Sequence, residues 1–351
     1  MKAKRLLRPG PCVFGSLAIL MILCASSGNA APQGRTQAQA KAQKYPKLPD
    51  DVERRSVTIW SDGARMAGDI YQPKDVEEGQ KLPVIVFIHG TGGVKKMGWS
   101  CRIANHFAQS GYLFLNFDYR GWGESDSKLQ MLEAMPNPDE NNEITVKARA
   151  IRWQMDFADQ VADIRNAIAF MSGEKNADYS RIGILGTSYG GGLVTYVAGH
   201  DPRVKASAAQ VPGMGGGRGR QFEYHQYVQQ TQRARGDIEP VPFKTGAPGG
   251  KMSSYAHMRY NIAKGIGYDV FEAAGRIKTP MLIIDAGKEE LMDITKNGGK
   301  VAGILKANGV PVTYHIYEDI NHYGIYGKRL VDAAKMEIEF FDEHLKPKKE
   351  N

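Results

Sequence analysis

The sequence predicts an α/β fold, built on an open, mostly parallel sheet with helices on both faces and with lid-like insertions. Short apolar runs rich in β-branched residues recur along the chain, as strands buried on both faces of a parallel sheet require. Stretches with a helical period separate these runs, and this alternation is typical of a parallel sheet. The chain has 351 residues, of which 42% are apolar and 24% charged, a composition that suits a globular protein with a full core.

The predicted domain covers residues 51–347 and begins with an antiparallel hairpin. Residues 56–60 alternate like a strand, Ser61-Asp62-Gly63 forms a turn, and residues 66–71 return. The other predicted strands are 84–88, 113–117, 182–185, 206–211, 281–284 and 312–317. The predicted helices include 101–110, 157–172, 190–199 and 331–345. Residues 31–50, rich in Ala, Gln and Lys, are predicted to be a flexible N-terminal segment.

Residues 1–30 have the pattern of a signal peptide. Basic residues between Lys2 and Arg8 precede an apolar run at 13–25 and then small residues at 26–30. The apolar run is shorter than the ~20 residues that span a bilayer. We therefore expect cleavage after Ala30 or Ala31, and an exported protein, periplasmic or secreted, with no integral membrane span after signal removal.

The charge of the mature chain argues against nucleic acid as a partner. Loss of the basic signal residues lowers the formal net charge from +8 to about +4. Lys and Arg are mixed with Asp and Glu along the rest of the chain, which is typical of a solvated surface. Of the three cysteines only Cys101 follows the predicted cleavage site, so no internal disulfide is expected.

A candidate nucleophile follows the predicted strand at 182–185. The sequence there is Gly186-Thr187-Ser188-Tyr189-Gly190, a G-x-S-x-G motif between a strand and a helix. Such a turn holds the serine at strained backbone angles, and its neighbours have to be small, which glycine satisfies. The motif is common by chance, but its position between strand and helix favours Ser188 as a nucleophile.

The loop after the strand at 84–88 reads His89-Gly90-Thr91-Gly92-Gly93. A loop at this position supplies one backbone N–H of an oxyanion hole, and the residue after the nucleophile supplies the other, which assigns the two roles to Thr91 and Tyr189. Each such donor commonly stabilises a tetrahedral intermediate by about 3 kcal/mol. His89 is expected to brace this loop rather than to act as a base.

A serine nucleophile needs a general base, because the neutral hydroxyl is weakly reactive. Of the eight histidines, only His322 lies in a loop between the last predicted strand and the C-terminal helix. His315 falls within a strand, and His344 lies near the chain end. We therefore expect His322 to be the base.

Together these motifs resemble the α/β-hydrolase superfamily. The resemblance is carried by Gly186–Gly190, His89-Gly90, residues 116–125 and the order Ser, acid, His, and it covers residues 55–345. The chain is most similar to the branch of dienelactone hydrolases, acetyl esterases and Xaa-Pro peptidases. The resemblance implies attack by serine on a carbonyl, an acyl-enzyme and its hydrolysis by water. It implies no metal and no organic cofactor, and the sequence has no spaced His/Cys/Glu cluster of the kind that binds zinc.

The acid of the triad has two candidates. The carboxylates after the strand at 281–284 are Asp285, Glu289, Glu290 and Asp293. In relatives the acid lies three residues beyond the glycine of a His-Gly step that ends this strand. Counting from the strand selects Glu289, which we expect, whereas counting from Gly287 selects Glu290. Asp285 and Asp293 are expected to serve structure.

Two insertions, 126–155 and 213–276, leave the sheet at the side where its strands end, so either is positioned to cover a cleft. The glycine- and arginine-rich run that begins the second insertion is interpreted as a loop, because it does not connect a strand to a helix in the manner of a phosphate-binding motif. The aromatic residues Tyr224, Tyr227 and Phe243 are expected to line the acyl or alcohol pocket.

The sequence favours a serine hydrolase that cleaves a carboxylic ester, or a thioester, of a small molecule through an acyl-enzyme on Ser188. The alternative is a serine peptidase of the prolyl-oligopeptidase or Xaa-Pro type, which commonly carries a large extra domain. A non-catalytic binding protein on the same fold is a third possibility, but such proteins usually lack one of the three catalytic residues. The sequence specifies neither the natural acyl and alcohol groups nor the oligomeric state.

Overall fold

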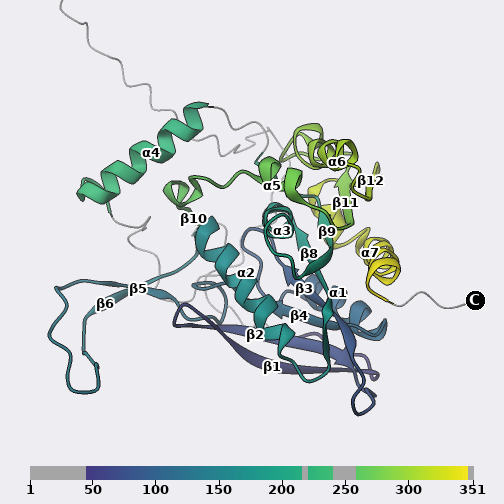
Figure 1. Ribbon diagram of the computed structural model, residues 1–351, viewed down its shortest axis with the longest axis horizontal. Helices are drawn as coiled ribbons and strands as arrows, with labels where there is room; N and C mark the ends of the chain where they lie inside the picture. Colours follow the sequence, from purple (N-terminus) through teal and green to yellow (C-terminus); the bar gives the residue numbers. More distant parts are fainter. Residues whose placement is uncertain (1–44, 216–219, 240–257, 347–351) are drawn as a thin grey trace, which may run out of the picture. The chain divides into compact units, whose positions relative to one another are not determined.

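The computed structural model describes residues 45–215, 220–239 and 258–346. These residues form an eight-stranded sheet with helices packed against it, and the strand order is β1-β2-β4-β3-β8-β9-β11-β12 (Figure 1). The pairs β1–β2 and β2–β4 are antiparallel, and every other pair in this sheet is parallel. The predicted fold class is confirmed. The predicted signal peptide and residues 31–44 of the N-terminal segment lie outside the described residues.

Each strand predicted from an apolar run is present in the main sheet. The bounds are β1 (Val52–Ser61), β2 (Ala64–Pro73), β3 (Leu82–Ile88), β4 (Leu113–Phe117), β8 (Ala177–Thr187), β9 (Val204–Gln210), β11 (Met281–Ala286) and β12 (Val312–Tyr317). β3, β4 and β11 are buried along their whole length, because helices cover both faces of the sheet. This burial explains why their sequences are continuous apolar runs rather than alternating ones.

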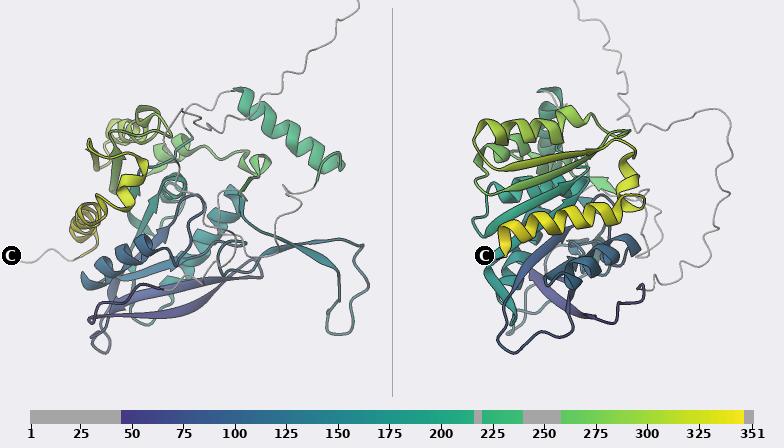
Figure 2. Two further views of the ribbon diagram at one scale, coloured as in Figure 1. Left: turned by 180° about the vertical axis from the view of Figure 1, so that it is seen from behind. Right: turned by 90° about the vertical axis from the view of Figure 1, so that its right-hand side faces the viewer.

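The helices divide between the two faces. α1 (Gly98–Gln109) and α7 (Leu330–Leu345) pack together on one face, as Figure 2 shows. The other face carries α2 (Phe157–Ser172), α3 (Tyr189–Ala198), α5 (Val270–Arg276) and α6 (Gly298–Ala307). Two hydrophobic cores therefore form, one on each side of the sheet.

The two insertions add elements that the sequence does not predict. In the first, β5 (Lys128–Met131) and β6 (Ala148–Ile151) pair as an antiparallel arm that projects away from the main sheet (Figure 1). In the second, α4 (Arg220–Arg235) precedes β10 (Arg259–Tyr260) and the 3₁₀ helix η2 (Ile262–Gly265). β10 pairs in parallel with β7 (Gln154–Met155) of the first insertion, so the two insertions are joined to each other.

The predicted flexible segment 31–50 differs from the structure in its last residues. Tyr45 and Leu48 pack against the core on the side of α1 and α7. The phenol of Tyr45 also donates a hydrogen bond of 2.5 Å to Asp69 in β2. The segment is predicted to be flexible from its average composition, which is polar and rich in Ala and Gln. These two apolar side chains nevertheless pack against the domain.

Helix α7 places a carboxyl group in the core. Glu337 is fully buried, next to β9, and burial raises the pKa of this carboxyl to about 8. In the unfolded chain a glutamate titrates near ~4.3. The folded state therefore holds a proton that the unfolded state releases, and the free energy of unfolding falls as the pH rises from the lower value to about 8.

Replacing Glu337 by Gln is expected to remove this loss of stability. The variant and the wild type should unfold with similar free energies near pH 4, and the variant should be several kcal/mol more stable at pH 9, at about 1.4 kcal/mol per unit of pKa difference. Urea unfolding at both pH values measures the difference. Glu339→Gln, at an exposed position of the same helix, is the matched control. An unchanged pH dependence in Glu337→Gln would contradict the protonated state.

Candidate active site

Ser188 lies in a sharp turn between β8 and α3. Its backbone has φ 52° and ψ −124°, a left-handed conformation that is strained for a residue with a side chain. The turn is held by its own backbone: the N–H of Ser188 donates to Gln210 at 2.9 Å, and its carbonyl accepts from Gly191 at 2.9 Å and from Gly213 at 2.8 Å. A Cβ at Gly190 would lie 2.1 Å from the carbonyl oxygen of Ile88, so only glycine fits there.

His322 connects Ser188 to a carboxylate. Its Nε2 lies 3.1 Å from Ser188 Oγ, and its Nδ1 lies 2.8 Å from Glu289 Oε2. His322 begins the 3₁₀ helix η4 (His322–Tyr326), directly after the loop that follows β12. The side chains of His322 and Glu289 are each only 3% exposed. The structure thus brings together the serine, the histidine and the first-choice acid that the sequence selects.

Glu290, the alternative acid, contacts the same histidine at a different atom. Its Oε2 accepts a hydrogen bond of 2.9 Å from the backbone N–H of His322. Its Oε1 accepts one of 3.0 Å from the side chain of Asn321. Glu290 therefore fixes the loop that carries His322, whereas Glu289 contacts the imidazole ring.

The other two candidate carboxylates, Asp285 within β11 and Asp293 after it, make no hydrogen bond to the ring of His322. Asp285 is buried and accepts a hydrogen bond of 2.9 Å from the hydroxyl of Tyr314. Burial raises the pKa of Asp285 to about 7, and the nearby charge of Glu289 adds to the increase. Asp293 accepts hydrogen bonds from Thr295 and caps the short helix η3 (Ile294–Lys296).

The loop after β3 passes directly beside Ser188. A Cβ at Gly90 would lie 2.9 Å from Ser188 Cβ, so the backbone can approach this closely only because Gly90 has no side chain. Thr91 is the next residue of this loop, and Tyr189 is the first residue of α3. Both expected oxyanion-hole residues therefore border Ser188. The side chain of Tyr189 extends toward α2, where its hydroxyl donates to Gln160 Oε1 at 2.5 Å.

His89 is part of the packing of this loop. Its ring is fully buried, with its centroid 4.4 Å from that of Tyr119 and 5.6 Å from that of Trp122. Burial lowers the pKa of His89 to about 4, so the imidazole is neutral near pH 7. This environment agrees with the expectation that His89 braces the loop.

Sequence reasoning missed a buried cation at the end of the same loop. Lys95 Nζ lies 2.9 Å from Asp69 Oδ2, 2.9 Å from Glu124 Oε2 and 2.5 Å from the hydroxyl of Tyr45. The backbone N–H of Lys95 donates to Asp118 at 2.7 Å. Burial alone would lower the pKa of Lys95, but these carboxylates raise it, so the ammonium stays charged. The sequence around Lys95 does not predict that this lysine is buried, because the side chains that contact it come from distant segments of the chain.

Two of the three aromatic residues that are expected to line the substrate pocket have exposed side chains. Tyr224 and Tyr227 lie on α4 with exposed side chains, and Phe243 lies outside the described residues. In the described part of the chain, no three His, Cys, Asp or Glu side chains are grouped so that they could hold a metal ion. Over the same residues, none of the helices combines the length and the apolar character that crossing a bilayer requires.

The fold and this arrangement of side chains define a serine hydrolase. The family model of the X-Pro dipeptidyl-peptidases (S15 family) matches residues 62–237, and that of the prolyl oligopeptidase family matches residues 153–348. The chain therefore belongs to the α/β-hydrolase superfamily, in the part that these two families represent.

Three similar proteins illustrate this relationship. An uncharacterized 31.7 kDa protein in the traX-finO intergenic region of Escherichia coli is 27% identical over 302 residues, which cover 77% of this chain and 94% of that protein. The quorum-quenching protein AidA of Acinetobacter baumannii is 32% identical over 167 residues, covering 48% of this chain and 45% of AidA. The crystal structure of the hypothetical protein PA2218 of Pseudomonas aeruginosa superposes with a TM-score of 0.60 at 20% identity, covering 88% of this chain and 99% of that one. This last similarity shows a shared fold.

Proposed function

We propose that the protein hydrolyses carboxylic esters of small molecules through an acyl-enzyme on Ser188, with His322 as the general base and Glu289 as the acid of the triad. The observation that carries this proposal is the continuous contact from Ser188 Oγ to His322 Nε2, at 3.1 Å, and from His322 Nδ1 to Glu289 Oε2, at 2.8 Å. The base has to lie within hydrogen-bond reach of the proton that it removes, and His322 meets this condition.

Each residue has one task in this mechanism. His322 takes the proton of Ser188 as the serine oxygen attacks the ester carbonyl, and then delivers it to the departing alcohol. Glu289 accepts a hydrogen bond from Nδ1, which fixes the tautomer and stabilises the imidazolium. The N–H groups of Thr91 and Tyr189 stabilise the oxyanion. Water activated by His322 then attacks the acyl-enzyme, and free Ser188 is restored.

A serine peptidase of the prolyl-oligopeptidase or Xaa-Pro type is the alternative, and the two family matches favour it. The charges of a cavity between the two insertions support the ester. A peptidase that acts on a free N-terminus needs an anion to hold an ammonium group. Of the two carboxylates that line this cavity, Asp159 is already paired with Lys128 and Asp156 caps α2, while neither Arg233 nor Lys264 forms an ion pair among the described residues. This excess of positive charge disfavours an ammonium group.

A substrate panel tests the proposal. We expect higher kcat/KM for p-nitrophenyl esters of short and medium acids than for aminoacyl or Xaa-Pro p-nitroanilides. The reverse order would establish the peptidase, and a protein inert toward both panels would support a binding function on this fold.

We also propose that the protein is exported, because basic, apolar and small residues follow one another at 1–30. Protein recovered from the cell envelope or the medium is expected to begin near Ala31 or Pro32. N-terminal sequencing that finds residues 1–20 intact in a soluble cytosolic fraction would reject export.

A further inference from the structure

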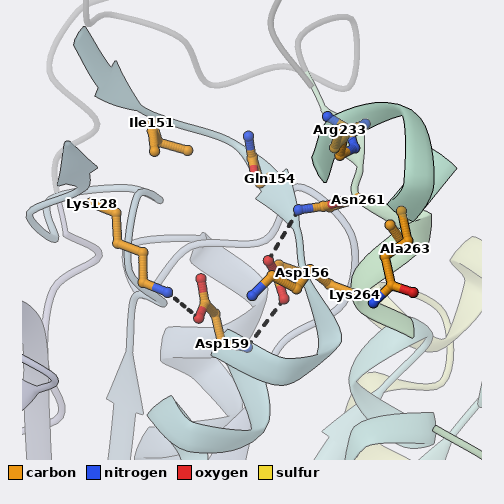
Figure 3. A pocket seen from close by; sticks show the side chains of 10 residues that line it. Lys128, Ile151, Gln154, Asp156, Asp159, Arg233, Asn261, Ala263 and Lys264 are labelled. Atoms are coloured by element: carbon orange, nitrogen blue, oxygen red, sulfur yellow. Dashed lines mark hydrogen bonds and ion pairs between the residues drawn. The ribbon is translucent and has the colours of Figure 1, made fainter. Parts of the chain in front are cut away.

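A cavity of about 360 Å³ lies between the two insertions and the start of α2 (Figure 3). The first insertion and α2 form one wall, and α4 with η2 forms the other. Every lining side chain except those of Ile151 and Ala263 is polar or charged. A cavity of this volume accommodates a small molecule, and its lining selects a polar one.

The charges of this cavity do not balance. The carboxylate of Asp159 is paired with Lys128, and Arg120 lies 3.7 Å away. Asp156 caps α2 and accepts a hydrogen bond of 3.3 Å from Asn261. These contacts use both acids of the lining.

Two cations of the lining form no ion pair among the described residues. Within the same residues, Arg233 donates to the carbonyl of Glu239, at 2.8 Å, and to the side chain of Gln229, at 3.5 Å. For the ammonium of Lys264 no hydrogen bond or ion pair occurs within residues 45–215, 220–239 and 258–346. The cavity therefore presents two positive groups to whatever occupies it.

Three polar atoms around the cavity are buried without a hydrogen-bond partner in the described part of the chain. They are Arg233 Nε, Asn261 Oδ1 and Gln160 Nε2. Gln160 is 2% exposed and Asn261 is 5% exposed, so neither side chain is free to turn to solvent. Gln160 lines a small extension of the cavity beside Arg120. Buried polar atoms nearly always have a partner, and an occupant with both donors and acceptors would supply one to each of these three atoms.

The cavity is connected to the nucleophile by a single side chain. α2 leads through a short turn into β8 and packs against it, which places the start of α2 at the sheet edge where β8 reaches Ser188. Gln160 accepts the 2.5 Å hydrogen bond from Tyr189, the residue that follows Ser188. The direction from Ser188 along the side chain of Tyr189 therefore leads toward this cavity.

We propose that the cavity binds a carboxylate at the far end of the substrate, with Arg233 and Lys264 as its cationic partners and with Asn261 and Gln160 hydrogen-bonded to a neighbouring polar group. The guanidinium plane of Arg233 suits a carboxylate, which it binds through two parallel hydrogen bonds. The assignment to the substrate rests on the proposed esterase function, whereas the binding of a carboxylate does not.

Equilibrium binding of glutarate, measured by calorimetry, tests the cavity without any turnover. We expect millimolar affinity in the wild type and at least a 10-fold weaker affinity in Arg233→Gln and in Lys264→Gln. Lys205→Gln is the matched control, because it removes the same charge from an exposed lysine whose ammonium donates to the carbonyl of Pro202 and, among the described residues, forms no ion pair. Equal affinity in all four proteins would overturn the proposal.

Pairs of p-nitrophenyl esters then test the assignment to the substrate. Each pair has the same acyl chain length, and one member ends in a carboxylate while the other ends in a methyl group. At the best chain length, the ratio of kcat/KM for the two members is expected to fall at least 10-fold in Arg233→Gln and in Lys264→Gln. An unchanged ratio, in variants that no longer bind glutarate, would overturn the assignment to the substrate. A wild type that binds glutarate but hydrolyses no ester would refute the esterase function and leave the carboxylate site standing.

Discussion

Replacing Ser188 by alanine is expected to lower kcat by about 10⁶-fold, the loss that follows removal of the nucleophile from a serine triad. The change deletes one oxygen and keeps the Cβ, so the turn between β8 and α3 should survive. A fluorophosphonate probe should label the wild type at Ser188, as located by mass spectrometry, and leave the variant unlabelled.

Ser207→Ala provides the control for this experiment. Ser207 is a buried serine of β9, the strand next to β8, and its hydroxyl oxygen has no hydrogen-bond partner among the described residues. Its replacement should leave both kcat and labelling unchanged. Full activity in Ser188→Ala, with the probe attached elsewhere, would reject Ser188 as the nucleophile.

Glu289→Gln is expected to lower kcat by about 10⁴-fold while the protein stays folded, because an acid-to-amide change in a triad leaves the histidine in the wrong tautomer. The carboxylate accepts a hydrogen bond of 2.8 Å from Nδ1–H, whereas an amide at this position offers a donor as readily as an acceptor. Initial rates across a pH range, together with a thermal unfolding curve, separate this effect from a loss of structure.

Glu290→Gln is the matched variant, one residue further along the chain. Its amide oxygen can still accept from the backbone N–H of His322, so we expect a much smaller decrease in kcat, roughly 10-fold or less. Near-normal turnover in Glu289→Gln, with the large loss in Glu290→Gln, would transfer the role of the acid to Glu290.

Elements that are buried on both faces could be predicted from the sequence, whereas exposed or very short elements could not. The strands of the parallel sheet could be predicted because burial on both faces demands continuous apolar runs, as in β3 and β11. α4 could not be predicted, because polar residues predominate in it and its few apolar residues do not form one face of the helix. The pair β7–β10 could not be predicted either, since its very short strands come from different insertions.

In the site, too, only residues that belong to a local sequence motif or follow a predicted strand could be predicted. Ser188 and its glycines form a local motif, because the geometry of one tight turn dictates neighbouring residue types. His322 follows from its position after the last strand. The choice between Glu289 and Glu290 could not follow from counting alone, because both side chains reach His322, one at the ring and one at the backbone. Arg233 in α4 and Lys264 in η2 line one cavity because these two helices pack together, which no local sequence pattern reveals.

The phenol of Tyr45 has a consequence for where the working enzyme starts. The phenol oxygen accepts a hydrogen bond from the buried ammonium of Lys95 and donates one to Asp69. Lys95 lies near the end of the loop that carries Thr91. Proteolytic trimming as far as residue 44 removes none of the contacts described above, so such a product should keep its full turnover. Trimming past Tyr45 withdraws a partner from a buried charge and is expected to loosen the loop beside Ser188. Turnover is therefore expected to depend on whether Tyr45 is retained, although this residue lies outside the sheet.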